Sequence, residues 1–156
     1  MAFNDLREFI TFLEQHGQLQ RVTAPVSTDL EITEITDRVS KAGGPALLFE
    51  HVRGYDMPVL INTFGSEERM AWALGVKSLD ELGDRIKRWL DIVQNRPPDG
   101  LLEKAKLAPE LLELTRIGPH TVSHAPCQEV VITDHPSLDT LPILKCWPLD
   151  GGHYLT

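Results

Sequence analysis

Two histidines with helical spacing are the first residues whose types could support chemistry. His120 and His124 lie four positions apart, which on a helix would place both imidazoles on one face as metal ligands. Pro119 and Pro126 disfavour a helix here, and no carboxylate stands at the spacing that a metal site would need. We therefore interpret both as loop histidines, with a metal or acid–base role as the alternative.

Cys127 is the second candidate, because His124 lies close to it in the sequence. A nucleophilic thiol needs a neighbouring base and a lowered pKa, and no third residue completes a triad here. Free cysteines more often behave as small buried hydrophobes. The sequence therefore favours a buried thiol, or one at a strand edge, over a catalytic one.

Three carboxylates, Glu31, Glu34 and Asp37, lie within two turns of one expected helix. Paired carboxylates can perform general acid–base catalysis. Helix capping by Glu31, and an i, i+4 ion pair between Glu34 and Arg38, account for them without chemistry. We favour a solvated helix face.

Two loops could bring the backbone close to a ligand. Asn62–Ser66 joins an apolar strand to a helix N-terminus, where free N–H groups can hold a phosphate. Its single glycine lacks the spacing of phosphate-binding loops, so a plain strand-to-helix turn is favoured and a phosphate binder is the alternative. Cys146–Tyr154 contains a Trp-Pro step and a Gly-Gly pair; a simple β-turn is favoured here, and a tight turn with a close backbone approach to a ligand is the alternative.

The elements that would position these residues follow from hydrophobic periodicity and capping residues. We expect helices from the N-cap Asn4 to Gly17, from a Thr28–Glu31 capping box to Gly43, from Ser66, and from a Ser78–Glu81 capping box. Apolar runs predict strands at Leu19–Val22, Ala46–Phe49, Val59–Ile61 and Val130–Thr133. Short helical pieces are expected within residues 101–114.

The order of these elements predicts a mixed α/β (α+β) fold in two parts. Residues 1–118 alternate helices with short apolar strands, which is enough for one small domain. Residues 119–156 read as the opening of a β-rich domain, with too few strands to close a sheet or barrel. We therefore expect the sequence to be cut from a longer one.

Composition excludes several classes of protein. Of the 156 residues, 42% are hydrophobic and 24% charged, as in soluble globular proteins. A formal charge of −8 argues against binding nucleic acid or an anionic membrane. No apolar run approaches the roughly 20 residues of a membrane span, and the N-terminus lacks a signal-peptide layout. Two cysteines make no disulfide framework, so we expect free thiols and a cytoplasmic location.

Six segments spread along the chain form a recognisable set: NDLREF (4–9), LEITEITDR (30–38), AGGPALLFE (42–50), APCQ (125–128), LPIL (141–144) and CWP (146–148). In this order they resemble the UbiD decarboxylase family, and most of all its 4-hydroxy-3-polyprenylbenzoate decarboxylases. The resemblance implies an N-terminal α/β domain (1–118), followed by the start of a split, flavin-reductase-like β-barrel (119–156).

The resemblance also implies a non-oxidative, reversible decarboxylase of aromatic or α,β-unsaturated acids. Family members use prenylated FMN with a divalent metal, here expected to be manganese (Mn²⁺), and potassium (K⁺), and the flavin supplies the electron sink. Their metal ligands, and their catalytic arginine and glutamates, follow the segment that matches Asp150–Thr156. No catalytic, cofactor-binding or metal-binding residue is therefore assigned within this chain.

Two hypotheses follow from the sequence. In the first, the parent protein is a homo-oligomeric carboxy-lyase that acts on a small aromatic acid, such as 4-hydroxy-3-polyprenylbenzoate in quinone biosynthesis. The 156-residue chain by itself is then expected to be inactive and to bind none of the cofactors tightly. In the second, the chain is a standalone, non-catalytic interaction or scaffold module.

Overall fold

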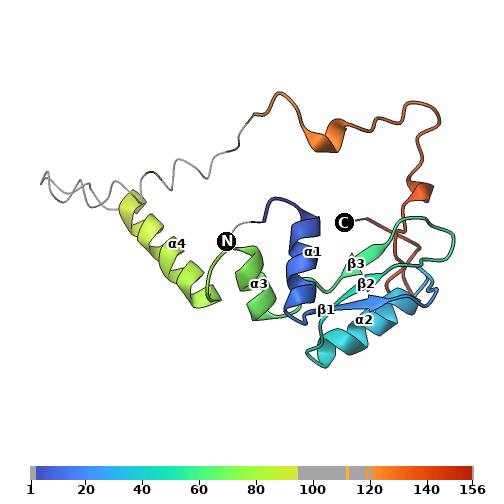
Figure 1. Cartoon of the computed structure of the whole chain (residues 1–156), viewed down its shortest axis with the longest axis horizontal. Coiled ribbons are helices and arrows are strands. Elements are labelled where there is room, and N and C mark those ends of the chain that lie inside the picture. Colours follow the sequence, from blue (N-terminus) through green and yellow to red (C-terminus); the bar gives the residue numbers. More distant parts are fainter. Residues whose placement is uncertain (1–2, 95–111, 113–118, 120, 156) are drawn as a thin grey trace, which may run out of the picture. The chain divides into compact units, whose positions relative to one another are not determined.

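The computed structural model describes residues 3–94, 112, 119 and 121–155. By compactness they belong to two units, residues 1–79 with 137–156, and residues 80–136. The first unit contains α1 (Leu6–Gln15), β1 (Leu19–Val22), α2 (Glu31–Lys41), β2 (Ala46–Phe49), β3 (Val59–Ile61) and α3 (Glu67–Ala73) (Figure 1). Helix α4 (Leu79–Gln94) and a 3₁₀ turn at Pro126–Gln128 lie in the second.

Helix α1 begins with a reciprocal cap. The side chain of Asp5 accepts a hydrogen bond from the N–H of Glu8 at 2.8 Å, and the carboxylate of Glu8 accepts from the N–H of Asn4 at 2.7 Å. The N-cap is therefore Asp5, and the prediction of Asn4 is wrong by one residue. Gly17 follows the helix with φ of 67°, which confirms the predicted left-handed stop.

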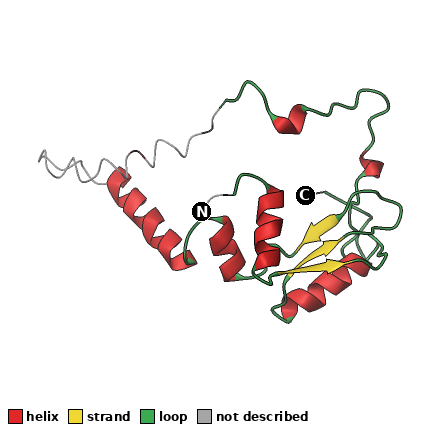
Figure 2. Ribbon diagram, in the orientation of Figure 1, coloured by secondary structure: helices red, strands yellow, loops and turns green. Residues whose placement is uncertain are grey.

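The three predicted strands of the N-terminal part form one sheet in the order β1-β2-β3. Strand β1 pairs in parallel with β2, from Leu19 opposite Ala46 to Val22 opposite Phe49, and β3 pairs antiparallel with β2. Helix α2 makes the crossover that two parallel neighbours require. Figure 2 shows the sheet with α2 on one side and α1 on the other.

Both faces of the central strand β2 are buried, and each belongs to its own apolar cluster. Leu47 and Phe49 join Val26, Ile32 and Val52 in the first cluster, on the side of α2. Ala46 joins Phe9 and Leu13 of α1 in the second cluster. This alternation is the period of a strand covered on both faces, and it explains the continuous apolar run in the sequence.

Helix α2 ends as predicted but begins differently. Gly43, with φ of 68°, follows its last turn. Its N-cap is Leu30, which has φ of 66° and makes no side-chain cap, so the predicted Thr28–Glu31 capping box is wrong. Glu31 instead accepts a hydrogen bond from the N–H of Ser27 at 2.7 Å.

The structure differs most from the expectation after residue 120. Residues 130–133 form no strand, and Val130 is 81% exposed. The described residues contain one open sheet of three strands, so the flavin-reductase-like barrel stays a prediction. The domain boundary at 118, His120 and all but Leu112 of the helical pieces within 101–114 lie outside the described residues. No described helix has the length and apolarity needed to cross a membrane.

Candidate functional site

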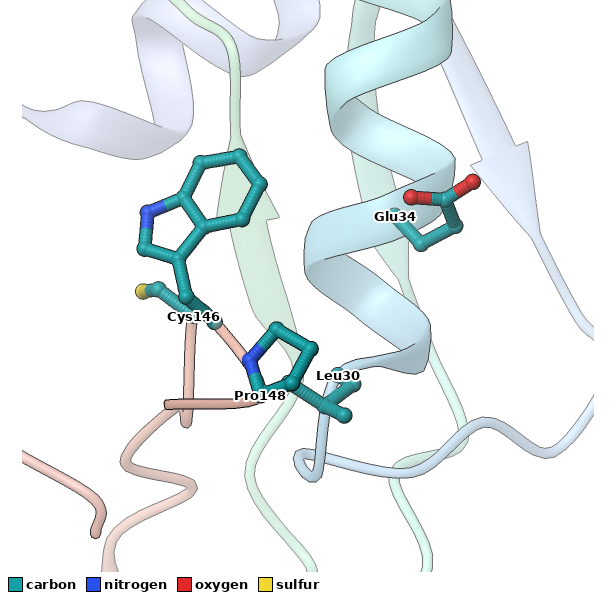
Figure 3. A pocket seen from close by; sticks show the side chains of 5 residues that line it. Leu30, Glu34, Cys146 and Pro148 are labelled. Atoms are coloured by element: carbon teal, nitrogen blue, oxygen red, sulfur yellow. The ribbon is translucent and has the colours of Figure 1, made fainter. Parts of the chain in front are cut away.

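A small cavity lies where the C-terminal segment crosses the start of α2. Its volume is about 250 Å³, and its lining residues are Leu30, Glu34, Cys146, Trp147 and Pro148. Figure 3 shows Leu30 and Glu34 on the side of α2, with Cys146 and Pro148 on the crossing segment. The cavity therefore joins two stretches of chain that are more than a hundred residues apart in sequence.

Backbone pairing at Lys145 holds the crossing segment in place. Lys145 lies opposite Asp29 as a parallel bridge. Its N–H donates to the carbonyl of Thr28 at 3.0 Å, and its carbonyl accepts from the N–H of Leu30 at 3.2 Å. Leu144, one residue earlier, packs on the first apolar cluster. The segment is thus part of the packing of the first unit.

A turn that begins at Trp147 shapes the wall of the cavity opposite Leu30 and Glu34. The N–H of Trp147 donates to the Asp150 carboxylate at 2.8 Å, and the N–H of Asp150 donates to the Trp147 carbonyl at 3.1 Å. The second bond closes a β-turn, which confirms the interpretation favoured for this stretch. A hydrogen bond to the side chain of Cys146 raises the pKa of Tyr154, because it stabilises the neutral hydroxyl.

The described lining of the cavity assembles no catalytic group and leaves little room for a ligand. The one carboxylate in its lining, Glu34, is engaged by Nε of Arg38 at 2.6 Å, and the remaining walls are mostly apolar. Its volume is below the roughly 300–1,000 Å³ of sites for drug-sized ligands. No nucleophile–base pair is assembled there among the described residues.

The three carboxylates of α2 each have a partner on the protein surface. Arg53 Nη1 lies 3.2 Å from Glu31, Arg38 pairs with Glu34, and Lys41 Nζ lies 2.7 Å from Asp37. The Glu34–Arg38 pair confirms the predicted i, i+4 contact, and the surface partners of all three carboxylates agree with the predicted solvated helix face.

The residues around Cys127 do not form a catalytic group. Cys127 is exposed in the 3₁₀ turn, so the predicted buried or strand-edge position is wrong. Its expected strand does not form, which leaves the thiol uncovered. His124 Nε2 lies 3.4 Å from the carboxylate of Glu129. Within the described ranges, no three histidine, cysteine, aspartate or glutamate side chains are placed to hold a metal ion.

The stretch Asn62–Ser66 forms the plain strand-to-helix turn that was predicted. Ser66 caps α3 by accepting from the N–H of Arg69 at 3.2 Å. Arg69 is fully buried, and it donates to the carbonyls of Asn62 and Thr63 at 3.2 and 3.3 Å. The guanidinium of Arg69 therefore fills the turn. The sequence did not indicate this role, because no pattern of residues near Arg69 predicts its burial.

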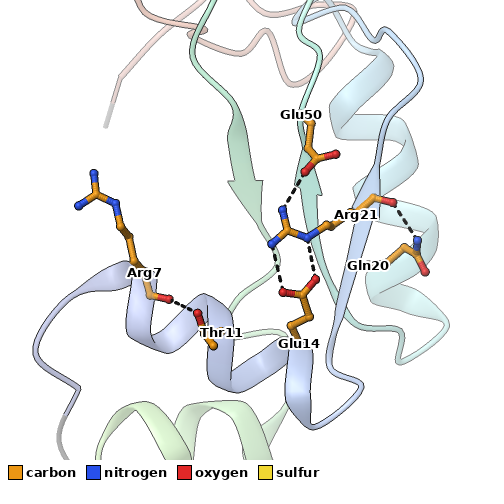
Figure 4. Close-up of polar contacts among 6 residues, drawn as sticks. All are labelled: Arg7, Thr11, Glu14, Gln20, Arg21 and Glu50. Atoms are coloured by element: carbon orange, nitrogen blue, oxygen red, sulfur yellow. Dashed lines mark hydrogen bonds and ion pairs between the residues drawn. The ribbon is translucent and has the colours of Figure 1, made fainter.

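A second polar network lies on the surface of the first unit. Arg21 of β1 donates to Glu14 of α1 at 2.6 Å and to Glu50, which follows β2, at 2.7 Å (Figure 4). The hydrogen bond from Arg21 lowers the pKa of Glu14, and both carboxylates raise the pKa of Arg21. The three residues come from three separate stretches of the chain, so no sequence spacing indicated them.

Two family models match the chain in succession. Residues 10–86 match the N-terminal domain of 3-octaprenyl-4-hydroxybenzoate carboxy-lyase, of the UbiD type, and residues 120–156 match the Rift-related domain of the same enzyme. An uncharacterized protein of Aquifex aeolicus is 47% identical over 99% of this chain and 32% of its own length. One of Archaeoglobus fulgidus is 46% identical over 100% of this chain and 31% of its own. The chain thus spans about a third of the curated relatives it matches.

Solved structures align along nearly the whole chain. Vanillic acid decarboxylase of Sedimentibacter hydroxybenzoicus in its open form is 28% identical, with a TM-score of 0.72, over 98% of this chain and 30% of that one. Its closed form is 29% identical, with a TM-score of 0.71, over 98% and 29%. An evolved dimeric form of the UbiD-class enzyme HmfF of Pelotomaculum thermopropionicum, in complex with prenylated FMN, is 28% identical, with a TM-score of 0.67, over 99% and 31%.

Proposed function

This chain belongs to the UbiD family, and from that premise we propose that it is the N-terminal third of a carboxy-lyase that decarboxylates an aromatic or α,β-unsaturated acid without oxidation. The observation that carries the proposal is the succession of the two family matches, residues 10–86 and then 120–156, along one chain. The alignment of solved UbiD-class and decarboxylase structures over the same residues supports it.

A flavin is the proposed cofactor, because a solved relative contains prenylated FMN and another form of the same enzyme contains FMN. When bound, prenylated FMN would supply the electron sink for loss of CO₂. The described residues do not fit its metal, since no three of their histidine, cysteine or carboxylate side chains converge. We therefore expect the ligands of Mn²⁺ and K⁺ to lie outside the described residues.

The described residues serve the enzyme by building a scaffold. The two-faced packing of β2 and the hydrogen bonds at Lys145 fix the end of the segment that the Rift-related match covers. Chain that continues beyond Tyr154 in longer relatives then starts from a defined position. Sites built on such rigid elements keep their geometry better than sites on free loops.

The proposed substrate is 4-hydroxy-3-polyprenylbenzoate, in quinone biosynthesis. Both family models carry the description of a 3-octaprenyl-4-hydroxybenzoate carboxy-lyase, and one solved relative is a vanillic acid decarboxylase. We further propose a homo-oligomer, since a solved relative is dimeric. A cytoplasmic location is supported by Cys127 and Cys146, both free thiols.

The test uses the full-length protein encoded by the reading frame of this chain. It is produced with prenylated FMN, Mn²⁺ and K⁺ and offered 4-hydroxybenzoates with and without a prenyl chain, and cinnamate-type acids. We expect CO₂ release from at least one acid, with the prenylated benzoate preferred, and none from the 156-residue chain. Absence of turnover with every acid by a flavin-loaded protein would overturn the proposal and favour a non-catalytic module.

A further inference from the structure

Residues 141–147, named the strap below, cross the start of α2 without forming a strand and make one isolated β-bridge there, between Lys145 and Asp29. We propose that the strap is a releasable clamp whose docking holds the backbone of Leu30, and with it the first turn of α2, in a strained conformation. This inference is independent of the proposed activity. It concerns how the two family domains are mechanically joined.

No residue of the strap is fully buried: residues 141–146 are half-buried and Trp147 is exposed. The two backbone hydrogen bonds at Lys145 are joined by one from the hydroxyl of Thr33 to the Lys145 carbonyl at 3.4 Å. The ammonium of Lys145 lies 3.9 Å from the Asp29 carboxylate, and Leu144 supplies the apolar anchor. Strand β2, by contrast, pairs along its length with two neighbours. Regions with few buried contacts open first, so the strap opens before the sheet.

Leu30, at the start of α2 where the strap docks, has a strained backbone. Its φ of 66° and ψ of −29° lie in the left-handed region, which a residue with a side chain adopts only with backbone strain. The N–H of Glu31 donates to the carbonyl of Asp29 at 2.8 Å, which closes a three-residue turn around Leu30. Such outliers persist where the surroundings over-determine them. Here the carbonyl of Lys145 is the surrounding group that accepts from the N–H of Leu30.

Release of the strap therefore changes both partners at once. Leu30 loses its hydrogen-bond acceptor and can return to a common backbone conformation. The cavity is lost in the same event, because one wall is Leu30 and Glu34 and the other is Cys146–Pro148. Docking of the strap and the strained conformation at the start of α2 therefore form together and are lost together.

Docking of the strap links the two family domains. The strap lies in the segment that matches the Rift-related domain, whereas Thr28–Leu30 lies in the match to the N-terminal domain. Downstream of the strap, His153 Nδ1 lies 2.5 Å from the carbonyl of Ile143, so the following turn is tied back to it. A force on the chain after residue 150 is therefore transmitted to α2 through the strap.

Hydrogen–deuterium exchange on the 156-residue chain tests the coupling. Leu144→Ala removes the apolar anchor, and Leu149→Ala, at a residue 99% exposed, is the matched control. We expect the amides of Leu30 and Lys145 to exchange at least tenfold faster in Leu144→Ala, by the same factor, with Leu47 of β2 changed less. Leu149→Ala leaves all three rates as they are. Faster exchange at Lys145 alone, or an equal change at Leu47, would overturn the proposal.

A second pair of variants tests the strain itself. Leu30→Gly and Leu30→Ala both remove the side chain, but only glycine adopts a positive φ without cost. We expect the Lys145 amide to exchange about five to ten times more slowly in Leu30→Gly than in Leu30→Ala, because relief of strain at Leu30 favours the docked strap. Equal rates in the two variants, or slower exchange in Leu30→Ala, would show that docking does not depend on the strained backbone.

Discussion

The guanidinium of Arg69 donates to the side-chain oxygen of Gln18 at 2.7 Å, across 51 positions of sequence. The same side chain bonds two carbonyls of the turn before α3, and it is buried completely. Burial lowers its pKa, since desolvation disfavours the cation. Arg69 thus ties the start of β1 to the end of β3 through neutral acceptors.

Replacement of Arg69 by methionine should destabilise the protein by about 3 kcal/mol, because it leaves part-buried acceptors at Gln18, Asn62 and Thr63 without their donor. Urea unfolding measures the change. Arg38→Met is the matched control, since the Arg38 side chain is 78% exposed and its loss should matter little. Equal midpoints for the two variants would contradict a structural role for Arg69.

Gly65→Ala should destabilise the same turn by about 1–3 kcal/mol through steric overlap. A Cβ at this position would lie 1.9 Å from Oδ1 of Asn62 and 3.0 Å from Nη2 of Arg69. Gly151→Ala adds the same methyl group where nothing lies within 4 Å, and it should be tolerated. Thermal unfolding of both variants checks this. A Gly65→Ala protein as stable as Gly151→Ala would refute the close approach.

Arg21→Met should raise the pKa of Glu14, because the hydrogen bond from Arg21 is the main cause of its lowering. Ionised Glu14 contributes stability above its unfolded pKa, roughly 4.3, and the contribution is lost as the pH falls through the lower folded pKa. NMR titration of the Glu14 carboxyl measures the shift. Arg7→Met is the control, because the Arg7 side chain points away from the pair in Figure 4. An unchanged Glu14 titration in Arg21→Met would be the contrary result.

Cys146→Ala should lower the pKa of Tyr154 toward the ordinary tyrosine value of about 10. The raised pKa means that the hydrogen-bonded hydroxyl stabilises the fold below that value, and that this contribution is lost as the pH rises through the folded pKa. Tyrosinate absorbance in a Tyr55→Phe background follows Tyr154 alone, since the chain has two tyrosines. Cys127→Ala, at an exposed thiol, should leave the titration unchanged. A Cys146→Ala curve that coincides with it would rule out the bond.

The N-terminal elements could be predicted because local signals decide them. Gly17 and Gly43 end their helices, Ser66 starts α3, and three apolar runs form the sheet. Each depends on a few neighbouring residues whose backbone preferences agree with the packing.

The start of α2 could not be predicted, because a distant segment decides it. Thr28 and Glu31 have the spacing of a capping box, yet Lys145 takes the backbone groups of Thr28 and Leu30 and imposes a positive φ. Val130–Thr133 shows the reverse error. Its β-branched residues favour a strand, but a strand needs a neighbour to pair with, and none of the described residues supplies one.

The cavity was foreseen only in part. The composition of Cys146–Tyr154 indicated an unusual turn, but its partner wall, Leu30 and Glu34, carried no sign of it. Sequence spacing describes neighbours along one element, whereas this site depends on contacts across 112 positions, the separation of Thr33 and Lys145.

That separation also determines how long the start of α2 remains without the strap while the chain is being synthesised. Thr33 is made 112 residues before Lys145, so at about 5–20 residues per second the start of α2 waits between about 6 and 22 s for the strap. Throughout that interval the apolar surface that Leu144 will cover lacks this side chain. A nascent chain stalled before residue 141 should therefore bind a chaperone that the completed chain releases.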